Sequence, residues 1–184
     1  MCQLNRTLLV AFLLALAGCA STGSTNAPSG YTDYCNRHAD RAECRKTTRL
    51  PQNWRQIAED VQAEVNKLPY RADLERHGHA EFWDRIDSEG GDCEDFALEK
   101  LRLLVEAGFP IERVRLGTVI IPRFTSRGNR NHVVVVVDGY TDKFILDNRF
   151  PRVVPIAALI GQMYTLLNIQ SIGGSRQWVE WKFT

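Results

Sequence analysis

The residues best suited to chemistry lie in one short stretch around Cys93. Gly90 and Gly91 interrupt any preceding structure, and Asp92 can cap a helix that begins at Cys93, with Asp95 as its capping-box partner. The thiol is therefore expected at a helix N-terminus, where the helix dipole favours a thiolate by roughly 0.3–1 kcal/mol. That is less than one pKa unit, so position alone does not activate this cysteine.

Three carboxylates, those of Asp92, Glu94 and Asp95, flank the Cys93 sulfur. Like charges raise a thiol pKa, so they oppose the helix dipole. A hard cation such as calcium, bound by the acids, would offset them, and so would an imidazolium paired with the thiolate. A third interpretation is that the acids only cap the helix and Cys93 is a small buried hydrophobe.

A second candidate, His132, precedes a run of valines at 133–137 that is typical of a buried strand. If Gly139 and Tyr140 are the centre of a tight hairpin turn, the register places His132 directly opposite Asp147, where the carboxylate can orient the imidazole. A slip by one residue would separate them onto opposite faces. The alternative is a solvated histidine at a strand edge and an acid in a turn.

Cysteine, histidine and acid, in that chain order, are the parts of an activated thiol nucleophile. Helical spacing of apolar residues after Cys93, a glycine at 108 and Pro110 predict that the cysteine begins a core helix. The other expected elements are a helix from Pro51 to Leu68, a polar loop over 70–90, strands at 114–121, 131–137, 143–148 and 177–183, and a helical stretch over 156–166.

Length and charge restrict the function. The chain has 184 residues, enough for a sizeable core, and 23 Lys and Arg against 22 Asp and Glu. No basic field indicates nucleic-acid binding.

The first nineteen residues are typical of an export signal. Arg6 supplies the positive charge, a short apolar run follows, and Leu16 to Cys19 resembles the bacterial lipoprotein signal, in which Cys19 becomes the lipidated first residue. An ordinary secretory signal is the alternative. Alanine after Cys19 resembles lipoproteins sent to the outer membrane, which predicts a lipid-anchored periplasmic protein.

Residues 20–50 are expected to be a flexible tether followed by a small loop. Their first part is rich in Ser, Thr and Gly, and Cys35 and Cys44 most simply form a disulfide in an oxidising compartment. A metal knuckle that includes His38 lacks a fourth ligand. Cys93 is then a free thiol in an exported protein, which favours a reactive role.

The motifs around Cys93, His132 and Asp147 resemble the bacterial transglutaminase-like cysteine proteinases, the family that includes the LapG adhesin proteases. The resemblance covers residues 51–184 and implies a papain-like α+β fold with the nucleophile helix packed on an antiparallel sheet. It implies that Cys93 attacks a peptide carbonyl, that His132 carries the proton and that Asp147 orients His132. It also implies calcium bound by Asp92, Glu94 and Asp95, a surface adhesin as substrate, and an inner-membrane receptor for cyclic di-GMP as regulator.

Two rival functions stay open at this point. The same three residues can serve a transglutaminase or a cell-wall amidase, and the chain could also be a calcium-binding lipoprotein without turnover. LapG-like proteases are typically soluble in the periplasm, whereas this chain carries the lipidation signal and the Cys35 to Cys44 segment.

Overall fold

The computed structural model describes residues 24–26, 28–39, 41, 44, 50–122, 130–172 and 176–182. A seven-stranded sheet, antiparallel throughout, runs in the order β1-β7-β6-β2-β3-β4-β5. Its strands are β1 (Ser24–Asn26), β2 (Val114–Ile121), β3 (Arg130–Asp138), β4 (Lys143–Leu146), β5 (Val154–Pro155), β6 (Thr165–Gln170) and β7 (Gln177–Glu180). This sheet with its helices confirms the predicted α+β class.

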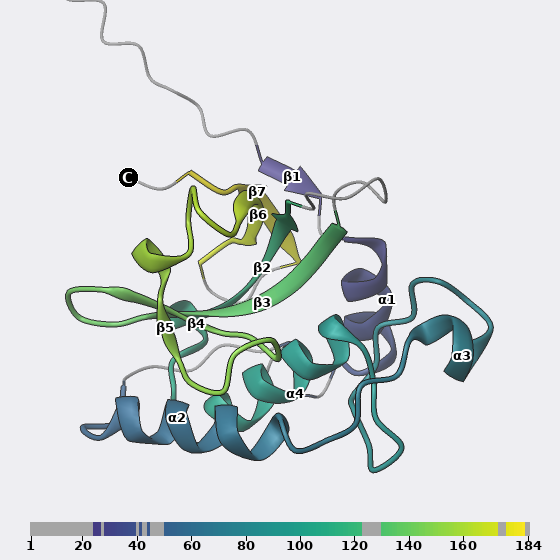
Figure 1. The fold of residues 1–184 in the computed structure, drawn as a ribbon, viewed down its shortest axis with the longest axis horizontal. Helices are drawn as coiled ribbons and strands as arrows, with labels where there is room; N and C mark the ends of the chain where they lie inside the picture. The colour runs from purple at the N-terminus through teal and green to yellow at the C-terminus, as the bar shows by residue number, and fades with distance from the viewer. Residues whose placement is uncertain are drawn as a thin grey trace, which may run out of the picture.

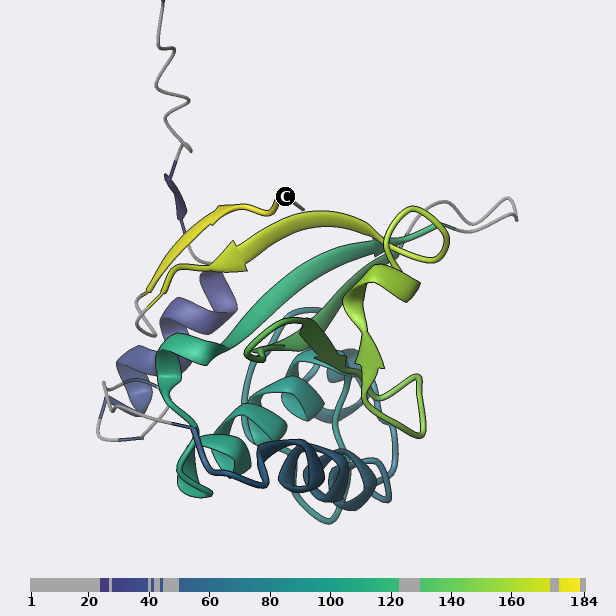
Figure 2. The ribbon, with the colours of Figure 1, turned by 90° about the vertical axis from the view of Figure 1, so that its left-hand side faces the viewer.

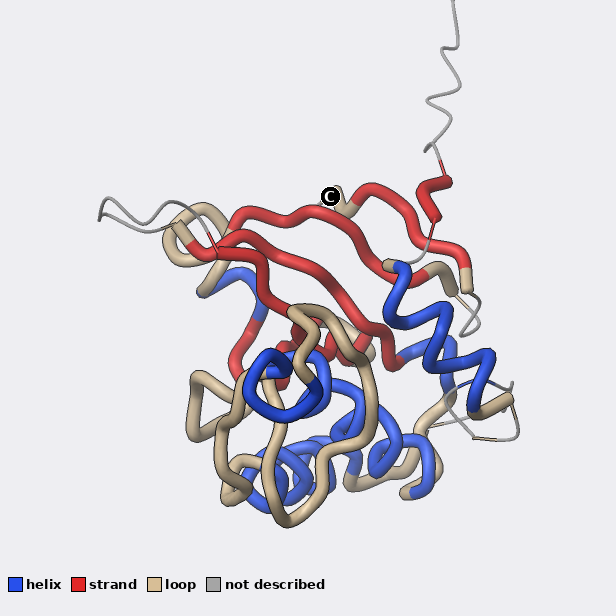
Figure 3. The backbone as a smooth tube through the Cα atoms, turned by 90° about the vertical axis from the view of Figure 1, so that its right-hand side faces the viewer, coloured by secondary structure: helices blue, strands red, loops and turns tan. Residues whose placement is uncertain are grey.

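Helices gather on one side of the sheet. They are α1 (Ser29–Arg37), α2 (Trp54–Val65), α3 (Asp73–His77) and α4 (Cys93–Glu106). A short 3-10 turn, η2 (Ile111–Arg113), precedes β2, and a second one, η3 (Ile156–Ala158), packs on the opposite face of the sheet. Figure 1 shows α4 between the sheet and α2, and Figure 3 shows most of the helical segments, in blue, below the curved strands. No described helix is long and apolar enough to cross a membrane.

The two faces of β3 serve two apolar clusters, because successive side chains of a strand point to opposite faces. Val133, Val135 and Val137 pack in the cluster that contains the buried face of α4. Val134 and Val136 pack in a second cluster with Ile156 and Tyr164. The valine run is thus buried on both faces, as predicted, and Figure 2 shows the curved strands above the helices.

The segment predicted as a tether and loop, residues 20–50, is partly folded. β1 pairs with β7, and α1 buries Tyr31 and Tyr34 completely. Tyr31 packs edge-on against Trp83 and Trp178, so aromatic burial fixes this segment to the core. The sequence interpretation gave weight to its Ser and Gly content and missed the two tyrosines.

Two other expectations are wrong. Residues 156–166 form only the short turn η3, and the chain then enters β6, which pairs with β2 and β7 in the middle of the sheet. The polar stretch 70–90 contains helix α3, whose Asp73 is buried. In both places contacts with distant parts of the chain override a weak local preference for helix or loop.

The predicted turn at Gly139 and Tyr140 is also misplaced. Asp138 pairs with Lys143 rather than Thr141, and the Gly139 N–H donates to the Asp142 carbonyl at 2.9 Å, so Tyr140 and Thr141 occupy the centre. Gly139 is needed for close approach, because an added Cβ would lie 2.6 Å from the Asp142 oxygen. The register therefore shifts by two residues.

Candidate active site

A tight loop places Cys93 at the first residue of α4. Gly90 has φ of +96°, and a Cβ there would lie 2.2 Å from the carbonyl oxygen of Pro69, so only glycine fits. Gly91 continues this contact, since its N–H donates to the Pro69 carbonyl and its carbonyl accepts the Arg71 N–H at 2.8 Å. Asp92 is then the extended N-cap residue, as predicted.

The Cys93 thiol is buried and donates a hydrogen bond to the Glu94 carboxylate at 3.0 Å. Burial raises the pKa of this thiol well above its usual range, and the charges of Glu94 and Asp92 raise it further. A backbone hydrogen bond from Val133 acts in the opposite direction. While the sulfur keeps its proton in the hydrogen bond to Glu94, Cys93 is a poor nucleophile.

Asp92 and Glu94 form an acidic cluster with the sulfur, with one ligand atom of each within 4.8 Å of the others. Burial, followed by the nearby Asp92, raises the pKa of Glu94 to about 10. One buried oxygen of Asp92, Oδ1, has no hydrogen-bond partner among the described residues. An unpartnered carboxylate oxygen beside a second carboxylate that it repels fits a hard cation such as calcium.

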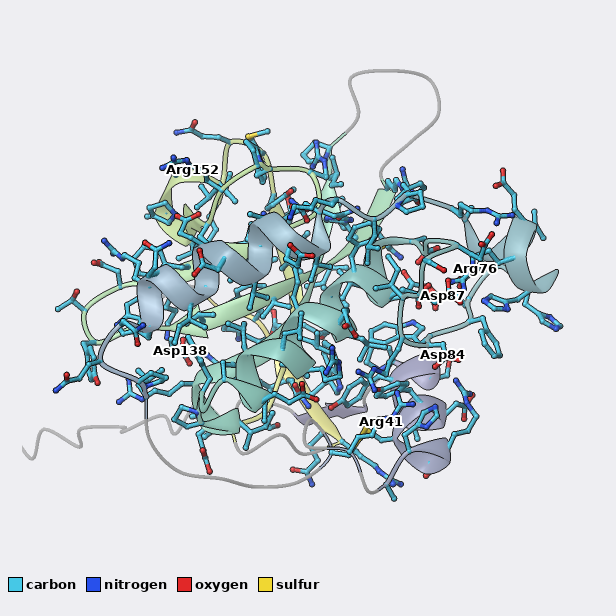
Figure 4. The ribbon with its side chains drawn as sticks, turned by 90° about the horizontal axis from the view of Figure 1, so that it is seen from below. Arg41, Arg76, Asp84, Asp87, Asp138 and Arg152 are labelled. Atoms are coloured by element: carbon cyan, nitrogen blue, oxygen red, sulfur yellow. A yellow bond between two sulfur atoms is a disulfide. The ribbon has the colours of Figure 1, made fainter. Side chains whose placement is uncertain are left out.

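Asp95 has a different position from the other two acids. Its Oδ1 accepts the Asp84 N–H at 2.9 Å, and its Oδ2 accepts the Asp92 N–H at 3.3 Å and lies 3.4 Å from Arg76. Both oxygens of Asp95 are thus already used in holding the loop. Figure 4 shows Arg76 beside Asp87, with which it forms an ion pair at 3.2 Å, and near Asp84.

Asp73 is an acidic residue that the sequence interpretation missed. It is 1% exposed, its Oδ2 accepts the Phe82 N–H, and its Oδ1 has no partner. Burial raises the pKa of Asp73, and one oxygen of it lies within 4.8 Å of Asp92 and Asp95. No sequence signal singles it out, because its proximity depends on how α3 folds back on the α4 loop.

His132 and Asp147 meet as predicted, although the register differs. The imidazole Nε2 lies 2.8 Å from Asp147 Oδ1, and both residues are buried. A shift of two residues keeps side chains on the same face, so the contact becomes a diagonal one at the end of β4. Nδ1 of the ring is left for a second partner.

Two further groups hold the Asp147 carboxylate. The Tyr164 hydroxyl donates to Oδ2, and the Arg149 N–H donates to Oδ1 at 2.8 Å. Burial raises the pKa of Asp147, but the hydrogen bond and charge of His132, with these donors, outweigh burial and bring it below its ordinary value. The acid therefore stays ionised beside the imidazole. Tyr164 was not foreseen as a partner of Asp147, because residues 156–166 were expected to be helical.

Cys93 and His132 line the same cavity, which has a volume of about 210 Å³. Trp83, Thr118 and Leu167 contribute to its walls. A second cavity of about 500 Å³ is also lined by His132 but not by Cys93. The three predicted residues thus come from α4, β3 and the end of β4, and the histidine lies at the junction of two cavities.

The remaining predicted residues fall in or near the N-terminal segment. Cys35 and Cys44 form a disulfide, and Cys93 is the free cysteine of the described residues. His38 lies 3.6 Å from Asp84 rather than in a metal knuckle. Cys19, the expected lipidation site, lies outside the described residues.

Comparisons with known proteins agree on one relationship. The model of the family "bacterial transglutaminase-like cysteine proteinase" matches residues 21–183. Among curated proteins, none matches the chain significantly.

Solved structures of Legionella pneumophila LapG are similar in fold. The calcium-bound form has a TM-score of 0.53 and 23% identity over 63% of this chain and 64% of that chain, which is less than two thirds of its length. Another LapG structure has a TM-score of 0.54 and 22% identity over 68% of each chain, and an EGTA-treated one has 0.52 and 22% over 64% and 63%.

Proposed function

Because the chain belongs to the bacterial transglutaminase-like cysteine proteinases, we propose that it cleaves peptide bonds with Cys93, His132 and Asp147. The observation that carries the assignment of residues is the 2.8 Å hydrogen bond between His132 and Asp147, beside a cavity that both His132 and Cys93 line. An imidazole oriented by a buried carboxylate next to a free thiol has the parts of an activated nucleophile.

The proposed reaction has two stages. The Cys93 sulfur attacks the carbonyl carbon while His132 accepts the thiol proton, and the imidazolium then gives that proton to the leaving amine as the peptide C–N bond breaks. Water, deprotonated by His132, next attacks the acyl-enzyme and releases the acid and the thiol. Asp147 holds the ring through Nε2, which leaves Nδ1 for both transfers. The Cys93 N–H at the start of α4 is a candidate donor to the oxyanion.

Calcium is part of the same proposal. Asp92 and Glu94 would hold the ion, since Asp92 Oδ1 is buried without a partner and the two acids repel one another. A bound divalent cation would supply positive charge that lowers the thiol pKa and would compete for the Glu94 carboxylate. The similar LapG structures include a calcium-bound and an EGTA-treated form, which is consistent with such a site.

The test of catalysis compares wild type with Cys93→Ser, His132→Ala and Asp147→Asn in calcium. We expect rapid labelling of Cys93 by iodoacetamide, slowed strongly in His132→Ala, and peptide cleavage reduced about 10³-fold or more in Cys93→Ser. Circular dichroism checks that each variant is folded. Cys93 no more reactive than free cysteine, or cleavage retained in Cys93→Ser, would contradict the proposal.

The calcium prediction has its own measurement. Calcium should raise the thermal midpoint and the labelling rate of wild type, because a ligand that binds only the folded state stabilises it, by about 2.7 kcal/mol at a hundredfold excess over Kd. Asp92→Asn and Glu94→Gln should abolish both responses, whereas Glu89→Gln, an exposed acid of the same loop, should keep them. If calcium changed the thermal midpoint and the labelling rate equally in wild type and in all three variants, the proposed calcium site would be contradicted.

For location and substrate, we propose an exported lipoprotein that is anchored to the outer membrane through Cys19 and acts on a cell-surface protein such as an adhesin. The lipoprotein-like signal and the disulfide support export to an oxidising compartment. Metabolic labelling with an alkyne fatty acid should mark wild type and not Cys19→Ala. Surface proteins shed by wild-type cells and retained in a Cys93→Ser strain would identify the substrate.

A further inference from the structure

The larger cavity, of about 500 Å³, is the feature that the proposed reaction does not yet use. Tyr70, Arg130, His132 and Arg149 line it, together with apolar atoms of Ile121. It opens directly beside the catalytic histidine, so a substrate bound at Cys93 must pass close to it.

The cavity carries the positive charges of two arginines, Arg130 and Arg149. Arg130 donates to the Tyr70 hydroxyl, and Arg149 donates to the Tyr164 hydroxyl at 3.1 Å. In the described part of the chain neither guanidinium has a carboxylate within 4 Å, whereas Arg76, Arg102 and Arg115 all do.

Tyrosine hydroxyls thus hold both arginine side chains in place, and neither guanidinium has a direct ion pair with a described carboxylate. A guanidinium has several N–H donors in a planar fork that matches a carboxylate. Two such groups at one cavity, neither in an ion pair with a described residue, form a site for an anionic group.

The position of His132 decides which part of a peptide would reach this cavity. Cys93 lines only the smaller cavity, and His132 lines both. The imidazolium must lie next to the leaving amine to protonate it, so the larger cavity is on the leaving-group side of the bond. That side holds the substrate residues that follow the cleaved bond.

We propose that the cavity between Arg130 and Arg149 binds an acidic side chain of the protein substrate, on the C-terminal side of the cleaved bond. This inference rests on the proposed function, because it assigns substrate preference to the same active site. It makes Arg130 a specificity-determining residue. Arg149 is less suitable for substitution, since its backbone N–H also donates a hydrogen bond to Asp147.

To test this inference, tryptic peptides from a bacterial proteome are incubated with the wild-type protein in the presence of calcium. Mass spectrometry then identifies the new cleavage sites. Cleavage that Cys93→Ser also produces is subtracted. Matched synthetic peptides that carry Glu or Gln at the preferred position then give the ratio of kcat/KM values. Arg130→Gln and the charge reversal Arg130→Glu are compared with Arg55→Gln, which removes one exposed positive charge from α2.

We expect Asp and Glu to be enriched after the cleaved bond, with a ratio for Glu over Gln of about tenfold in wild type and Arg55→Gln, in keeping with hydrogen bonds to charged groups near solvent. The ratio should approach one in Arg130→Gln and fall below one in Arg130→Glu, which should prefer Lys.

Three results would overturn the inference. Cleavage without acidic enrichment, or with enrichment only before the bond, would overturn it and leave the proposed function standing. A ratio unchanged in both folded Arg130 variants would do the same. Absence of any Cys93-dependent cleavage would instead remove the proposed function, and this inference with it.

Discussion

At the scale of single residues, burial alone does not decide the charge of an acid. Asp147 and Glu94 are both buried, yet the pKa of Asp147 is lowered and that of Glu94 is raised to about 10. Asp147 accepts hydrogen bonds from His132, Tyr164 and the Arg149 backbone, whereas Glu94 accepts the weak thiol donor of Cys93 and faces the carboxylate of Asp92. Strong hydrogen-bond donors therefore keep the orienting acid ionised, and a bound cation would do so at Glu94.

Lys100 allows a prediction about stability. It is 1% exposed, its Nζ has no hydrogen-bond partner among the described residues, and burial lowers its pKa from 10.5 to about 7, against the attraction of Asp147. Lys100→Met should raise the free energy of unfolding at about pH 6 by about 1–4 kcal/mol, because an apolar side chain of similar length carries no charge to desolvate. Chemical denaturation measures this.

The pH dependence of this gain has a definite sign. Between pH 7 and 10.5 the unfolded wild type binds the lysine proton more tightly than the folded protein, so the stability of wild type rises with pH. The advantage of Lys100→Met should be largest below pH 7 and should shrink toward pH 10. A variant less stable than wild type at every pH would mean that the ammonium makes a favourable contact in the core.

At the scale of elements, α2 supports the turn that carries the catalytic acid. Gln62 is fully buried, and its Nε2 donates to the carbonyl of Asp147 at 2.7 Å and that of Phe150 at 2.6 Å. Asn66, one turn later, also donates to Phe150 at 2.8 Å. The helix predicted only as a packing element thus fixes the main chain at Asp147.

Replacing Gln62 should expose this support. Gln62→Leu leaves the Asp147 carbonyl without its side-chain donor, so we expect a loss of about 1–3 kcal/mol in the free energy of unfolding and a lower kcat with little change in KM. Gln56→Leu, an exposed position of the same helix, is the matched control and should change neither. Equal stability and kcat for both variants would show that the turn holds without α2.

At the scale of the whole molecule, the N-terminal segment closes the fold. Tyr31 and Tyr34 of α1 are fully buried, and Tyr31 contacts Trp83, which lines the cavity of Cys93. The disulfide from Cys35 to Cys44 secures the C-terminal end of the same helix. Residues expected to lie outside the catalytic domain therefore support the wall of the site.

The disulfide should contribute measurably to global stability. Its sequence separation is 9 residues, and closing a loop of that size stabilises the folded state by about 2–3 kcal/mol in the chain-entropy model. The double variant Cys35→Ala, Cys44→Ala should lose about that amount in chemical denaturation, and reductant should lower wild type to the same value. If reductant and the double substitution both leave the midpoint unchanged, α1 is held by its aromatic contacts alone.

The sequence by itself determined the chemistry of the site. Gly90 and Asp92 determine where α4 begins, because a positive φ requires glycine and the N-cap requires a short acceptor side chain, and this put Cys93 at the helix start. The valine run located the strand of His132. The contact with Asp147 was predicted from a wrong turn, and it holds since a shift of two residues preserves the face.

Tertiary structure alone decided what surrounds these residues. Tyr164, Gln62 and Asp73 reach the site from distant segments, and no local pattern marks them, because their burial arises only when α2, α3 and the start of β6 pack against α4 and β3. Local sequence sets helix caps and strand faces through short-range sterics and hydrogen bonds. The pKa values and the two cavities depend on long-range packing, which determines which groups lose water together.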